Sequence, residues 1–146
     1  MKTSIRTYCL GVVTSAVIGF ATAFVWHLVL FQKLYENLGV IGRIEPNIPL
    51  GFIATLALSF VLAYLYLKII SPGDSPVRGG IRFGITVGVL NIIFWVLKFA
   101  ATQPLTSIPI FMVVECAFEL IQLTLVGIAL GFIYRRKQIS RAVSNK

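Results

Sequence analysis

The chain has 146 residues, of which 58% are hydrophobic and only 12% are charged, and its formal net charge is +8. A soluble domain is typically about 45–50% apolar and about 25% charged, and one of this size still exposes much of its surface to water. The composition therefore excludes a soluble globule, a disordered chain and a disulfide-rich scaffold, and it favours an integral membrane protein.

Four apolar runs are each long enough to cross a bilayer, for which a helix needs about 20 residues. The sequence predicts spans over about residues 8–31, 49–70, 81–102 and 108–134, followed by a short basic cytoplasmic tail at 135–146. Proline and glycine residues lie between the runs, as in the turn-forming segment 71–76. We expect a single all-α domain, an integral membrane, antiparallel four-helix bundle.

The first run resembles a signal peptide at its start, because Lys2 and Arg6 precede the apolar residues. The run continues to Phe31, which is longer than the ~7–15 residues of a signal-peptide core. We therefore expect this segment to be retained as the first span.

Basic residues predict the orientation of the bundle. With four spans, the N-terminus, the second connection and the C-terminus share one side of the membrane, and these segments carry Lys2, Arg6, Lys68, Arg78, Arg82, Arg135, Arg136, Lys137, Arg141 and Lys146. On the other side Lys33 and Arg43 are offset by Glu36 and Glu45. The positive-inside rule then places both termini in the cytoplasm.

The excess of basic residues also indicates which partners the chain binds. We expect the lipid bilayer as the partner and no nucleic acid, because no basic stripe with interleaved exposed aromatic residues is present. The long connection 32–48 is predicted to lie on the membrane surface, since it contains these apolar residues: Leu34, Leu38, Val40, Ile41 and Ile44.

Small residues recur at four-residue steps in three of the predicted spans. They are Gly11, Ser15, Gly19 and Ala23 in the first, Gly84 and Gly88 in the third, and Gly127 and Gly131 in the fourth. Such stripes allow helices to approach closely in lipid, so they predict packing seams of the bundle.

Six polar residues within the spans form the candidate ligand- or proton-binding set: His27, Asn91, Lys98, Glu115, Glu119 and Gln122. An ionisable group inside a span costs about 2.5–3.5 kcal/mol on insertion scales, so it indicates function. The last three share one face of the fourth helix, and Asn91 and Lys98, seven residues apart, share one face of the third. These residues predict a polar pocket in the outer half of the membrane.

Within this pocket the matching depths of Lys98 and Glu115 predict an ion pair, and Glu119 would exchange a proton with His27. Structural explanations remain open. Lys98 would snorkel to the outer surface, His27 would be an interfacial residue, and the two glutamates would bond between helices or contact another subunit. No nucleotide-binding loop, catalytic triad or Glu-x-x-His pair is present, so we expect neither a metal nor another cofactor, and nothing argues for an enzyme.

A proton-coupled small-molecule transporter, or a ligand-binding protein with an outward-facing polar pocket, is the function we expect. A chain this short would form a homodimer to make a transport path. Two alternatives are an accessory or assembly subunit of a larger membrane complex and a membrane enzyme acting on a lipid or quinone.

The end of the first span and its continuation read Trp-His-Leu-Val-Leu-Phe-Gln-Lys-Leu-Tyr over 26–35, and the last span contains Val-Gly-Ile-Ala-Leu-Gly over 126–131. These segments resemble a bacterial family of small four-span membrane proteins with a domain of unknown function. The resemblance implies the four-span fold and a location in the bacterial inner membrane, and it implies no activity.

Overall fold

The computed structural model describes residues 4–40, 47–71 and 73–144, and for 136–144 it describes the backbone only. Every element in this part of the chain is a helix, which confirms the all-α prediction. In chain order the elements are α1 (Ile5–Phe24), the π-helix η1 (Val25–Leu30), α2 (Gln32–Asn37), α3 (Ile48–Ile69), α4 (Pro76–Asn91), the π-helix η2 (Ile92–Val96), α5 (Leu97–Thr102) and α6 (Ile108–Ser144).

Four segments of the described chain are long and apolar enough to cross a membrane: Ile5–Leu30, Ile48–Ile69, Pro76–Thr102 and Ile108–Arg135. The third begins earlier than predicted because Ser75 caps it, accepting a hydrogen bond from the backbone nitrogen of Arg78, and because Pro76 suits a first helical turn. The predicted basic tail continues α6 as a helix to Ser144.

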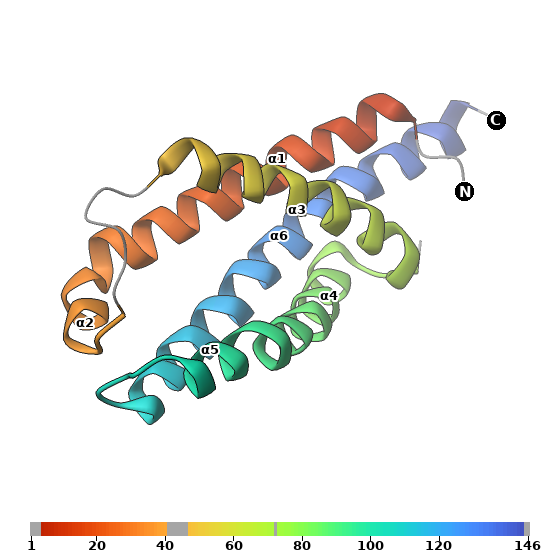
Figure 1. Ribbon diagram of the computed structural model, residues 1–146. Helices are drawn as coiled ribbons and strands as arrows, with labels where there is room; N and C mark the ends of the chain where they lie inside the picture. The colour runs from red at the N-terminus through yellow and green to blue at the C-terminus, as the bar shows by residue number, and fades with distance from the viewer. Residues whose placement is uncertain (1–3, 41–46, 72, 145–146) are drawn as a thin grey trace.

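The four spans form an antiparallel bundle in which α1 packs against both α3 and α6, and α4 packs along α6 (Figure 1). The start of α1 and the end of α6 lie at the same end of the bundle. Near their connection α3 and α4 meet, since a Cβ atom on Gly79 would lie 2.9 Å from the side chain of Ile70. From there the two helices diverge (Figure 1).

The α4–α6 interface is the closest packing in the bundle, and glycines make it possible. A Cβ atom on Gly127 would lie 2.6 Å from the carbonyl oxygen of Gly80, and one on Gly131 would lie 2.7 Å from that of Pro76. A Cβ atom on Gly84 would overlap the backbone of Thr124. The predicted packing role of these small residues is confirmed, because the two backbones touch where side chains are absent.

Two clusters of buried side chains hold the bundle together. One joins α1, α3, α4 and α6 around Phe83 and Leu130. The other lies at the end that holds α2, where Tyr35 and Leu38 pack against Val96 and Phe111. The first turns of the connection 32–48 therefore pack onto the end of the bundle. Its residues Ile41, Arg43, Ile44 and Glu45 lie outside the described residues.

Candidate functional site

Two π-helical segments interrupt the spans beside the candidate polar residues. In η1, which contains His27, the backbone nitrogen of Phe31 donates to the carbonyl oxygen of Trp26, five residues back, at 3.0 Å. In the third span, η2 begins directly after Asn91. A π-helical turn accommodates one extra residue, so it rotates the following side chains by about 100° relative to an uninterrupted α-helix. Such insertions occur frequently at functional sites.

His27 and Glu115 form the only ion pair between spans in the described part of the chain, with 3.3 Å between Nε2 and Oε1. The other imidazole nitrogen, Nδ1, lies 3.0 Å from the carbonyl oxygen of Ala23. Because a carbonyl oxygen only accepts hydrogen bonds, Nδ1 carries a proton. A second proton then lies between Nε2 and Glu115, either on the imidazole facing a carboxylate or on the carboxyl group facing a neutral imidazole. Both forms leave the pair with no net charge.

The predicted ion pair between Lys98 and Glu115 is wrong. Lys98 is exposed, and its Nζ atom lies 5.9 Å from the centre of the Phe94 ring. The helical insertion in η2 lies between Asn91 and Lys98, so the two side chains do not share the face that their seven-residue spacing predicts. The exposed position agrees with the alternative explanation, in which the side chain of Lys98 snorkels along the bundle surface.

Glu119 lies one helical turn further along α6 and is only 5% exposed. Asn91 of α4 interacts with its carboxyl group, and the charges of Glu115 and His27 act on it as well. Both glutamates thus face polar groups of their own chain. The structure brings together four of the six predicted residues.

Gln122 ties α6 to α1. Its Nε2 atom donates to the carbonyl oxygen of Gly19 at 2.8 Å and to the hydroxyl of Thr22 at 2.9 Å. Since both amide hydrogens are used in these bonds, Gln122 orients the helix that carries the glutamates. Its predicted role in binding a ligand or a proton gains no support from this geometry.

Aromatic side chains that the sequence did not single out flank the His27–Glu115 pair. The ring of Tyr35 stacks on the imidazole at 5.0 Å between centroids, and Phe118 meets it edge-on at 4.6 Å. The hydroxyl of Tyr35 and the indole nitrogen of Trp26 are buried without a hydrogen-bond partner among the described residues. Burial, reinforced by Glu115, raises the pKa of the Tyr35 hydroxyl, so this group stays protonated and available as a donor.

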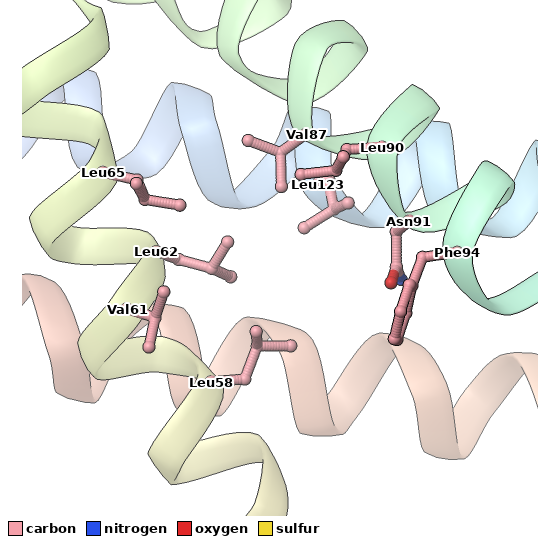
Figure 2. Close-up of a pocket in the computed structure, with 9 residues that line it drawn as sticks. All are labelled: Leu58, Val61, Leu62, Leu65, Val87, Leu90, Asn91, Phe94 and Leu123. Atoms are coloured by element: carbon pink, nitrogen blue, oxygen red, sulfur yellow. The ribbon is translucent and has the colours of Figure 1, made fainter.

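Aromatic rings flank this pair, and the side chain of His27 stays 34% exposed while that of Glu115 is 7% exposed. A separate pocket of about 300 Å³ lies between α3 and α4 (Figure 2). Eight of its nine lining residues are apolar, and the ninth is Asn91; the full set is Leu58, Val61, Leu62, Leu65, Val87, Leu90, Asn91, Phe94 and Leu123.

Comparison with protein-family models, with curated proteins and with solved structures found no match. Among the described residues, no group of three or more His, Cys, Asp or Glu side chains is arranged to hold a metal ion. The groups of this site that can carry a proton are His27, Glu115 and Glu119, and Asn91 lies beside them as a hydrogen-bonding group.

Proposed function

We propose that this protein is a proton-linked membrane protein that binds and carries a small ligand, with His27, Glu115 and Glu119 as its proton site. The observation that carries the proposal is the His27–Glu115 pair inside the bundle, with a second buried carboxyl group one turn away. Such groups are costly within a membrane, and apolar residues of similar volume would often stabilise a bundle as well or better. Their presence favours a function over a structural role.

The geometry supports a specific sequence of proton positions. The pair binds one shared proton, and Glu119 binds or releases a second one about 6 Å further along α6, at 1.5 Å per residue. Asn91 contacts Glu119 from α4 and also lines the pocket, so it connects the proton site with the space in which a ligand binds. Binding of a ligand beside Asn91 would then change the proton affinity of Glu119, and linkage requires the reverse effect as well.

We further propose that the bundle lies in a bacterial inner membrane, with both termini in the cytoplasm. The basic residues of the two termini and of the connection between α3 and α4 support this orientation. The resemblance to a bacterial four-span family supports the location. A reporter enzyme that is active only outside the cytoplasm is expected to be inactive when fused after Lys146, whereas a fluorescent protein fused there is expected to fold. The opposite pattern would overturn the orientation.

The proposed function is tested with Glu119→Gln. Proteoliposomes that contain the purified protein and a trapped pH dye are placed under a pH gradient and challenged with a fractionated small-molecule extract. Wild-type protein is expected to show proton movement that depends on the extract. Glu119→Gln is expected to reduce the rate of proton movement at least about tenfold, because the amide of glutamine neither gains nor loses a proton near neutral pH. The variant is expected to elute as the same assembly as the wild type.

Glu36→Gln is the matched control, because Glu36 is exposed on α2 and its carboxyl group bonds only to Gln32 among the described residues. It is expected to move protons at the wild-type rate. If Glu119→Gln equals the wild type, the proposed proton site is wrong. If the wild type moves no protons and Glu119→Gln instead releases the protein from a co-purifying chain, the role of an accessory subunit is correct. Cross-linking in the same vesicles tests the homodimer.

A further inference from the structure

The pocket between α3 and α4 lies within the membrane-spanning segments and opens to the side of the bundle. Leu58, Leu62 and Leu65 form its α3 wall, and Val87 and Leu90 form the α4 wall (Figure 2). The lining residues Val61, Leu90 and Phe94 are exposed on the outside of the bundle, so the pocket is open toward the lipid. A ligand therefore enters it from the bilayer, and the apolar walls fit a hydrocarbon chain.

One polar side chain interrupts these walls. Asn91 is half-buried and extends into the pocket beside Phe94 (Figure 2). The neighbouring carboxyl group of Glu119, in its carboxylate form, can accept one amide hydrogen of Asn91. The second amide hydrogen and the carbonyl oxygen of Asn91 remain, and in hydrocarbon both need partners. The pocket therefore offers a ligand one hydrogen-bond donor and one acceptor.

We propose that this pocket binds a long-chain fatty acid in its protonated form, with the carboxyl group on Asn91 and the chain between α3 and α4. A protonated carboxyl group presents one donor and one acceptor, which complements the free groups of Asn91. A ligand with carbonyl acceptors only, such as a quinone, would leave the oxygen of Asn91 without a donor. This inference rests on the proposed function, because it names the ligand class that the proton site serves.

The test is photolabelling of the full-length protein in lipid nanodiscs. The probe is a saturated long-chain fatty acid that carries a diazirine on its chain, and the comparison probe is its methyl ester, which lacks the carboxyl hydrogen. Peptide mapping is expected to place the label on segments 58–65 and 87–94. Labelling by the acid is expected to exceed labelling by the ester about tenfold. The ester cannot donate a hydrogen bond to the carbonyl oxygen of Asn91, and the loss of one such bond weakens binding by about this factor.

Two variants test the site independently. Asn91→Leu removes the polar group and is expected to reduce labelling by the acid about tenfold. Val61→Trp fills the pocket and is expected to abolish labelling of these segments, whereas Val113→Trp, at a position that is 70% exposed and does not line the pocket, is expected to change nothing. Equal labelling by acid and ester, or labelling spread evenly over the lipid-facing helices, would overturn the inference.

The proposed function and this inference fail separately. Proton movement that depends on Glu119, together with unspecific labelling, means that the proton site serves another ligand, which overturns the inference alone. Specific labelling that depends on Asn91, together with normal proton movement in Glu119→Gln, supports the fatty-acid site and overturns the proton-linked function.

Discussion

Replacing Gly84 with alanine is expected to destabilise the bundle by at least about 3 kcal/mol, the upper range for an overpacked interior. The new Cβ atom would overlap the backbone of Thr124 in α6. A backbone atom cannot move aside by rotating a side chain, so the two helices must separate along their closest interface. In lipid the association of helices depends on such contacts, because no hydrophobic driving force replaces them.

Unfolding in mixed micelles with increasing denaturing detergent, followed by circular dichroism, measures this effect. Gly51→Ala is the matched control, because Gly51 lies in α3 and a Cβ atom there meets nothing within 4 Å. Alanine is the better helix former by about 1 kcal/mol, so this control is expected to be neutral or stabilising. Equal stability of the two alanine variants would show that the described contact between α4 and α6 is incorrect.

Glu115→Leu is expected to destabilise the protein by about 2 kcal/mol, below the ~3–5 kcal/mol of a fully buried pair, because His27 is partly exposed. The substitution removes the hydrogen-bond partner of the imidazole Nε2 atom and leaves a polar group among aromatic rings. The double variant His27→Phe/Glu115→Leu is expected to recover most of the lost free energy of unfolding, since replacing both partners with apolar residues leaves no polar group unpaired.

The same unfolding experiment measures Glu115→Leu, the single variant His27→Phe and the double variant. Glu36→Leu on the exposed face of α2 provides the control, with an expected change below about 0.5 kcal/mol. If the loss of stability in the double variant equals the sum of the losses in the two single variants, the pairing of His27 with Glu115 is contradicted, because the effects of substitutions at independent sites are additive.

The bundle and its spans were predictable because hydropathy and length decide whether a segment crosses a membrane. The glycine stripes were predictable for a similar local reason, since Gly84 and Gly127 fall at helical spacing on their spans. The start of the third span was less accurate, because the glycines at 79 and 80 resemble a turn while Ser75 and Pro76 start the helix before them.

The site was only partly predictable. Helical spacing correctly grouped Glu115 with Glu119, but the choice of Lys98 as their partner assumed an uninterrupted α-helix. The π-helical segment η2 invalidates that assumption, and single-sequence periodicity carries no sign of it. The stacking of Tyr35 on His27 depends on where α2 folds back onto the bundle, and local sequence patterns do not determine that tertiary contact. The apolar pocket depends in the same way on the divergence of α3 from α4.

Infrared titration of the protein in lipid tests directly whether Glu119 exchanges a proton inside the bundle next to the His27–Glu115 pair, because a carboxyl group shows its C=O stretching band only when it is protonated. We expect a buried carboxyl band that changes with pH, that Glu119→Gln removes and that Glu115→Gln moves to a different pH. A titrating band that persists unchanged in Glu119→Gln would contradict the account.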